Sequence, residues 1–249
     1  MGRNNTADDT NELSGGVIGE STCVSILKEF ITNMAHNLYH LFVCEPEGDD
    51  LLRVIEMYRI LGLPGAIGSM DVTHVLYGRC PKHLKRSCIG KEEVPTLAFQ
   101  YVVDHNRRIV SVSQPFLGGT NDKTITCNDA FPVRVALGNY RDVEYVLYNN
   151  NGIPTLCTGV YFIVDGGYPV ESYLMCPKGY PSNVEDVKWS EWVESVCKDV
   201  ECIFDDCRRL SCFCWGVELP VLTEAEWQAE LTPPHGIRAR ARPWGTKCL

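Results

Sequence analysis

Two aspartates stand at places where apolar strands are expected. Asp71 lies in the otherwise apolar run of residues 67–72, and Asp165 directly follows the apolar residues 161–164. A carboxylate among apolar residues is costly unless it is paired or binds a cation. Two such groups on neighbouring strands repel each other, and Mg²⁺, which prefers oxygen ligands, removes that repulsion. Two ions about 3.5–4 Å apart can activate a water and stabilise the leaving oxygen in phosphodiester cleavage.

Each acid also has a structural interpretation. Asp165 precedes Gly166 and Gly167, and an aspartate at this position is often only a turn former. Asp71 can cap or pair locally. Glu201 lies on the polar side of an expected helix, where a carboxylate is more often solvated than catalytic. From residue types alone, the three acids suggest a metal site without establishing it.

Two helices are expected before the first acid. The first is indicated by apolar residues that recur every three or four positions: Val24, Leu27, Ile31, Met34, Leu38 and Leu41. The second helix should run from Asp49, its candidate N-cap, to Leu61, because Gly62 and Pro64 follow.

The acids themselves need strands to position them. Residues 67–77 and 161–164 are short and β-prone, so each predicts a strand. Residues 95–103 and 109–116 are apolar runs around the polar residues 104–108, which predicts a β-hairpin.

The remaining segments predict helices. Residues 121–137 are expected to be partly helical, and a later helix should begin at Ser190. That later helix has an apolar stripe and, opposite it, a polar stripe that contains Glu201. The apolar stripe consists of Val193, Val196, Val200 and Phe204. The alternation of strands and helices predicts an α/β domain.

The composition narrows the class of protein. The chain has 249 residues, 45% of them hydrophobic and 22% charged, which is enough for one substantial domain with its own core. The net charge of −9 counts against nucleic-acid binding through the whole surface, although a local basic groove remains compatible with it. Residues 145–164 carry no charge, but three Asn and a Pro interrupt them, so they are not a membrane span.

The cysteines indicate neither disulfides nor zinc. There are 13 of them at scattered spacings, with no secretory signal, which predicts reduced thiols in the cytosol or nucleus. Zinc sites prefer cysteine pairs two to four residues apart. The late cysteines instead recur every five residues, at Cys197, Cys202, Cys207 and Cys212.

Four segments together resemble the Harbinger-type DDE transposases and their domesticated nuclease relatives. Residues 68–74 resemble the first acidic motif of that family, residues 161–169 the second, and residues 198–204 the helix that carries the third. The 35 residues between Asp165 and Glu201 match the family's D-D-35-E pattern. Residues 118–122 resemble a segment between the first two acids, and the likeness extends from about residue 44 to residue 220.

The resemblance implies an RNase H-like fold, a mixed sheet flanked by helices, with an N-terminal helical segment. We expect a flexible leader at residues 1–20 and a helical segment at 21–63 that packs on the catalytic domain. The RNase H-like nuclease domain should occupy residues 64–220, followed by a polar, basic tail at 221–249.

The resemblance also implies an activity. It is hydrolysis of DNA phosphodiester bonds with two Mg²⁺ or Mn²⁺ ions, followed by strand transfer in an intact transposase. Asp71 and Asp165 would bind both ions, and Glu201 would complete one coordination sphere. Double-stranded DNA is the implied substrate, and a separate Myb-like DNA-binding protein is a possible partner. The implied location is the nucleus, reached after synthesis in the cytoplasm, with no membrane association and with oligomerisation left open.

Three further residues are candidates for supporting roles. His74 can position a phosphate or a metal ligand, but it is at least as compatible with a purely structural role. Asp122 is either an auxiliary acid or, as we favour, a helix N-cap. For Tyr168 we expect packing rather than chemistry.

A basic stretch follows the first acid. Lysine and arginine neutralise phosphates, so this stretch is the candidate DNA contact, with a solvated loop as the alternative. It comprises Arg79, Lys82, Lys85, Arg86 and Lys91. The arginines of residues 238–247 can bind DNA or direct nuclear import, but a disordered basic tail is the default expectation.

One stretch departs from the family pattern. Residues 205–214 replace the expected Gly and Leu-Lys-x-Arg-Phe-like run, and they place Asp205 and Asp206 directly after the turn of the third acid. The chain also ends early and shows no clear helix-turn-helix before the first acid. The second hypothesis is therefore a catalytically inactive, decayed or domesticated derivative that binds DNA or protein without cutting.

Overall fold

The computed structural model describes residues 19–78, 80–149 and 151–211. The described residues from Glu29 onward belong to one compact unit, and of the other unit only residues 19–28 are described. The expected leader, the basic tail and Arg79 therefore lie outside the described residues, apart from residues 19 and 20.

Helices and strands alternate along the chain. The helices are α2 (Glu20–Phe42), α3 (Gly48–Ile60), α4 (Lys85–Cys88), α5 (Asp122–Asn128), α6 (Ala130–Ala136) and α7 (Val184–Ser211). The strands are β1 (Ala66–Leu76), β2 (Thr96–Val103), β3 (Ile109–Val112), β4 (Phe116–Leu117), β5 (Glu144–Tyr148), β6 (Pro154–Thr158), β7 (Tyr161–Ile163) and β8 (Leu174–Met175). None of the described helices is both long and apolar enough to cross a bilayer.

The main sheet mixes parallel and antiparallel strands in the order β3-β2-β1-β7-β8, and β4 also pairs with β2. β1 runs antiparallel to β2 and parallel to β7, which in turn is parallel to β8. This mixed sheet with flanking helices is compatible with an RNase H-like fold, as the sequence led us to expect.

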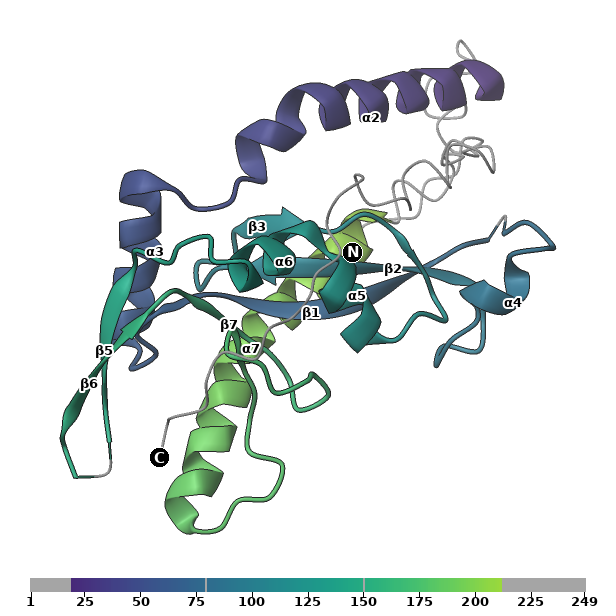
Figure 1. The fold of residues 1–249 in the computed structure, drawn as a ribbon. Helices are drawn as coiled ribbons and strands as arrows, with labels where there is room; N and C mark the ends of the chain where they lie inside the picture. The colour runs from purple at the N-terminus through teal and green to yellow at the C-terminus, as the bar shows by residue number, and fades with distance from the viewer. Residues whose placement is uncertain (1–18, 79, 150, 212–249) are drawn as a thin grey trace. The chain divides into compact units, whose positions relative to one another are not determined.

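Helices cover both faces of the sheet (Figure 1). Alternate residues of a strand point to opposite faces. On one face, Tyr101 meets Phe204 of α7 with ring centroids 5.5 Å apart. On the other, the side chain of Gln100 donates to Asp129, the N-cap of α6, at 2.6 Å. Asp71 pairs with Tyr101 across β1 and β2, so its side chain lies on the α7 face.

A continuous apolar core joins the sheet to these helices. Phe162 of β7 packs edge-on against Phe131 of α6 at 5.2 Å between centroids. From α7, the buried stripe is the one expected from its spacing: Val193, Val196, Val200 and Phe204. Burying each such side chain fully contributes roughly 1.5–3 kcal/mol, so the core fixes the sheet and α7 to each other.

Most expected elements are confirmed, with three corrections. α7 begins at Val184 rather than Ser190, because Asn183 accepts from the Asp186 N–H at 2.7 Å and Asp186 accepts from the Ser182 N–H at 3.0 Å. Such reciprocal bonds resemble a capping box. At the start of α3, Glu47 occupies the N-cap, not Asp49, and its side chain makes no capping bond. The first helix begins at Glu20 rather than near Val24.

A second hairpin was not expected. β5 and β6 form a separate two-stranded sheet, which apart from Glu144 lies in the charge-free residues 145–164. Its connection contains the sequence Asn-Asn-Asn-Gly at residues 149–152, and Asn-Gly between apolar runs is a strong hairpin signal. The strand that leads to Asp165 follows this hairpin and is β7.

Candidate functional site

Parallel pairing of β1 and β7 brings Asp71 and Asp165 together. The register pairs Gly68 with Phe162 and Ser69 with Ile163. Continued by two residues, the same register places Asp165 beside Asp71, at the roughly 4.8 Å spacing of neighbouring strands. On the other side of β7, pairing with β8 continues to Val164, whose N–H donates to the Met175 carbonyl at 3.0 Å.

Asp71 is the acid of this group whose pKa is clearly raised. Burial is the main reason why its pKa is raised to about 6, and a hydrogen bond from the Val72 backbone opposes the increase. The negative charges of Asp165 and Asp122 raise the pKa of Asp71 further, whereas Lys91 lowers it. Asp71 is therefore a partly desolvated carboxylate with two other acids close to it.

Asp165 combines the two roles considered from sequence. Its carboxylate accepts a hydrogen bond from the Gly167 N–H at 2.8 Å, which is the local bond of a turn former. The side chain is also exposed next to Asp71, where a cation can reach it. The turn then returns the chain to the core at Tyr168, which is only 5% exposed.

Asp122 reaches the acids from α5. The N-cap of α5 is Asn121, whose side chain accepts from the Lys123 N–H at 2.9 Å, so the expected capping role of Asp122 is wrong. α5 packs against the sheet through Ile125, which contacts Val72 and Phe116.

Close backbone contacts also hold the segment that leads into α5. A Cβ at Gly118 would lie 2.0 Å from the Thr96 hydroxyl and 2.5 Å from the Cys88 carbonyl. The neighbouring Gly119 N–H donates to the Ser87 carbonyl at 2.9 Å. Only glycine fits at residue 118, which is the physical reason for the Gly-Gly sequence before Asp122.

Glu201 approaches from α7, one helical turn after Cys197. Burial is the main reason why the pKa of the Cys197 thiol is raised, and the charges of Asp71, Asp165 and Glu201 add to it. The charges of all three acids therefore act on this one buried side chain, as does that of Asp199. Cys197 was missed from sequence as part of the site, although its position four residues before Glu201 on the apolar stripe was a usable signal.

The donor set suits a hard divalent cation. In the part of the chain that the structure describes, no three His, Cys, Asp or Glu side chains are spaced to bind one metal ion together. Mg²⁺, however, is usually bound by one or two carboxylates, with waters and substrate phosphates completing its shell. Asp71 and Asp165 supply that pair, and both are oxygen donors.

Comparison with known proteins shows the family of the chain. The model of the family described as plant transposon protein matches residues 40–209, more than half of the chain. The chain belongs to the plant transposon protein family. It is also similar to "Protein ALP1-like" of Arabidopsis thaliana, with 22% identity over 176 residues. That alignment covers 70% of the chain but 42% of the relative, so the chain spans less than half of the relative's length. No solved structure matches.

In this member of the plant transposon protein family, His74 is not beside the acids. It pairs with Ala98 across the sheet and lies an odd number of residues from Asp71, so the two side chains point to opposite faces of β1. The His74 ring nitrogen Nδ1 lies 3.0 Å from the Thr96 hydroxyl. His74 thus lies beside Thr96 of β2, close to Gly118.

The basic stretch lies beside the acids at one end. Lys82, Lys85 and Arg86 are exposed on and before α4, and Lys91 is exposed after it. Lys91 is close enough for its charge to lower the pKa of Asp71. Of the four described basic residues, Lys91 is the one whose charge acts on an acid of the site.

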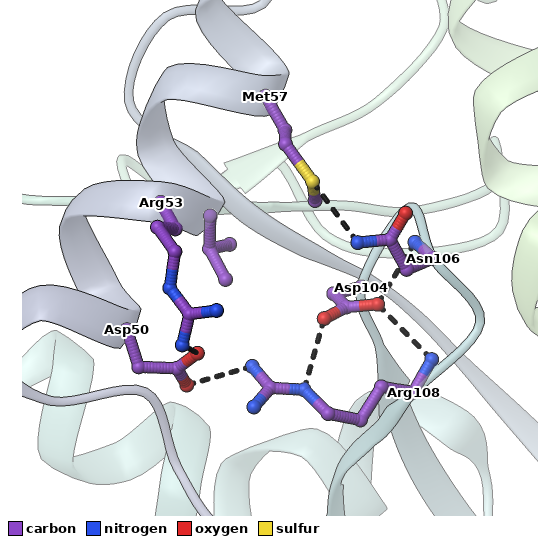
Figure 2. Close-up of a pocket in the computed structure, with 7 residues that line it drawn as sticks. Asp50, Arg53, Met57, Asp104, Asn106 and Arg108 are labelled. Atoms are coloured by element: carbon purple, nitrogen blue, oxygen red, sulfur yellow. Dashed lines mark hydrogen bonds and ion pairs between the residues drawn. The ribbon is translucent and has the colours of Figure 1, made fainter.

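A hollow elsewhere on the surface is a structural junction (Figure 2). Arg108 reaches Asp50 of α3 at 2.8 Å and Asp104 at 3.0 Å, and Arg53 also binds Asp50 at 2.9 Å. Asn106 donates to the Met57 sulfur at 3.1 Å. These groups satisfy one another and fasten α3 to the turn between β2 and β3, and none of the predicted site residues lines the hollow.

The raised pKa of Asp71 predicts an unusual pH dependence of stability. Without divalent cations, the folded chain holds a proton on Asp71 up to about pH 6, above the unfolded value of 3.8, so stability decreases as pH rises through this window. Asp71→Asn should therefore be more stable than the parent at pH 8, by up to about 3 kcal/mol, and no different below about pH 4. Urea unfolding in EDTA at both pH values measures this.

Asp186→Asn is the control of opposite sign. The hydrogen bond from Lys178, 2.6 Å long, lowers the pKa of Asp186, so this carboxylate stabilises the fold above its unfolded pKa. Asp186→Asn should lose stability at pH 8. An Asp71→Asn protein that is less stable than the parent at pH 8 would contradict the burial of the Asp71 charge.

Proposed function

We propose that this chain is the catalytic domain of a Harbinger-type DDE nuclease or transposase that hydrolyses DNA phosphodiester bonds with two Mg²⁺ or Mn²⁺ ions. The observation that carries the proposal is the parallel pairing of β1 with β7, whose register, continued by two residues, brings Asp165 beside Asp71. The family relationship supports the transposase origin.

The three acids have separate roles in this proposal. Asp71 and Asp165 would hold both ions, and Glu201 would complete the shell of one. The ions would activate a water and stabilise the charge on the leaving oxygen. The contribution of the protein is to hold two carboxylates at adjacent positions, one of them partly desolvated, so that a cation is attracted there.

Contacts along α7 hold the helix that carries Glu201. The Ser69 hydroxyl donates to the Val196 carbonyl at 3.1 Å, two residues before Asp71 along β1. Asp199 lies 2.7 Å from the Nδ1 atom of His105 in the turn after β2. Glu201 is thus on a helix that is fixed to the sheet by contacts before and after Asp71 along the chain.

Double-stranded DNA is the proposed substrate. Lys82, Lys85, Arg86 and Lys91 would bind its phosphates next to the acids, a local basic surface on an acidic chain. From the Harbinger resemblance we also propose that the protein acts in the nucleus and that a separate Myb-like protein recognises the DNA ends.

An inactive derivative is the second candidate function. The observation that favours it is the departure at residues 205–214, which adds two acids just after Glu201. α7 nevertheless continues as a helix to Ser211, through the first seven residues of this stretch. The side chains of residues 205–211 lie outside the described residues.

Cation binding and DNA cleavage test the proposal together. The purified chain should show a higher melting temperature with Mn²⁺ or Mg²⁺ and should cut supercoiled plasmid and labelled duplex in Mn²⁺. Asp71→Ala and Asp165→Ala should abolish both effects, because each removes half of the ligand pair. Glu201→Gln should retain most of the thermal shift while losing cleavage.

Three outcomes separate the two candidate functions. Cutting by the parent but not by Asp165→Ala establishes a metal-dependent nuclease. A cation-induced shift without cutting favours the inactive derivative with an intact site. Absence of any cation effect in the parent would contradict the metal site itself. Glu194→Gln, an exposed acid on α7, is the matched control for Glu201→Gln.

The DNA surface predicts a dependence on salt. Each phosphate contact contributes about −0.9 to the slope of log K against log salt concentration. The combined change of Lys82, Lys85, Arg86 and Lys91 to alanine should therefore weaken duplex binding and flatten this slope by up to about 3–4. Fluorescence anisotropy between 50 and 200 mM NaCl measures it, and Lys188→Ala on α7 is the control. An unchanged slope would place the DNA elsewhere.

A further inference from the structure

The hydroxyl of Tyr168 is buried without a hydrogen-bond partner among the described residues. The side chain is 5% exposed, and its ring belongs to the apolar core. A buried polar atom left unpaired costs about 1–3 kcal/mol. The ring alone would be supplied equally well by phenylalanine, so the packing role expected from sequence leaves the hydroxyl unexplained.

The surroundings of this hydroxyl are those of the acid site. After burial, the groups that most raise the pKa of Tyr168 are Asp71, Asp122 and Asp165, in that order. The hydroxyl is therefore neutral and close to three carboxylates. Ionised carboxylates only accept hydrogen bonds, whereas a phenol can donate one. Tyr168 is thus a donor next to a group of acceptors, on the turn that Asp165 itself closes.

We propose that Tyr168 is a positioning residue of the acid site, whose hydroxyl donates a hydrogen bond to an oxygen ligand of the cation held by Asp71 and Asp165. The inference rests on the proposed function and extends it to a residue outside the three acids. The oxygen ligand is either a water bound to the cation or a phosphate oxygen of DNA, since both accept from a phenol.

The contrast with Tyr58 supports this assignment. Tyr58 is also fully buried and its hydroxyl also lacks a partner within the described part of the chain. After burial, the groups that act on the pKa of Tyr58 are first the Ser69 side chain, which lowers it, and then the charges of Asp104 and Asp199, which raise it. Two orphaned tyrosine hydroxyls thus occur in one core, but only that of Tyr168 lies among the acids assigned to the cation.

The test is Tyr168→Phe in the full chain. In EDTA the variant should be as stable as the parent or more stable, because it removes an unpaired buried hydroxyl. Its affinity for Mn²⁺ without DNA, followed by electron paramagnetic resonance, should fall about tenfold if the acceptor is bound water. If the acceptor is a phosphate oxygen, Mn²⁺ affinity should stay the same while duplex binding in Ca²⁺ falls about tenfold. A tenfold loss corresponds to about 1.4 kcal/mol.

Tyr58→Phe is the matched control and should change neither affinity. If Tyr168→Phe leaves both affinities within twofold of the parent, the inference is overturned while the proposed function stands. If the parent binds no more Mn²⁺ than Asp165→Ala does, the proposed function fails and the inference fails with it. A variant that weakens both affinities only in proportion to a lower melting temperature in EDTA would show that the hydroxyl is structural.

Discussion

The parallel pairing of β1 with β7 forces two like charges to adjacent positions. Nothing in the apolar core requires a carboxylate at Asp71, and burial together with Asp165 raises its pKa to about 6. Like charges held close in a partly desolvated site disfavour the fold unless a cation neutralises them. The register between β1 and β7 is therefore the constraint on which the proposed cation-binding function depends.

The helices on both faces of the sheet support the pairing of β1 with β7. α7 covers the face that carries Asp71, and the Ser69 hydroxyl fastens it to β1. On the opposite face, Gln100 links Thr126 of α5 and Asp129 of α6 by hydrogen bonds of 2.8 and 2.6 Å. The helices on both faces hold the sheet in place. The acids and Tyr168 are therefore positioned by packed helices and strands.

Much of this arrangement could be predicted from the sequence, because strong local signals coincide with the elements. The apolar run before Asp165, the hairpin of β2 and β3, and the apolar stripe of α7 are examples. The start of α7 was missed because its capping depends on bonds between Asn183 and Asp186. The odd spacing of His74 and Asp71 along one strand already implied opposite faces, but which face carries the acids became known only from the pairing of β1 with β2 and β7. The packing role expected for Tyr168 agrees with its burial, but its unpaired hydroxyl is a property of the fold that spacing along the chain does not report.

Crystals of the chain soaked in Mn²⁺ would test the central claim most directly, through the anomalous signal of the ion. The account predicts an anomalous peak between the carboxylates of Asp71 and Asp165, in coordination contact with both, and no such peak in Asp165→Ala crystals. A fully occupied Mn²⁺ bound by other residues, with Asp71 and Asp165 unliganded, would contradict it.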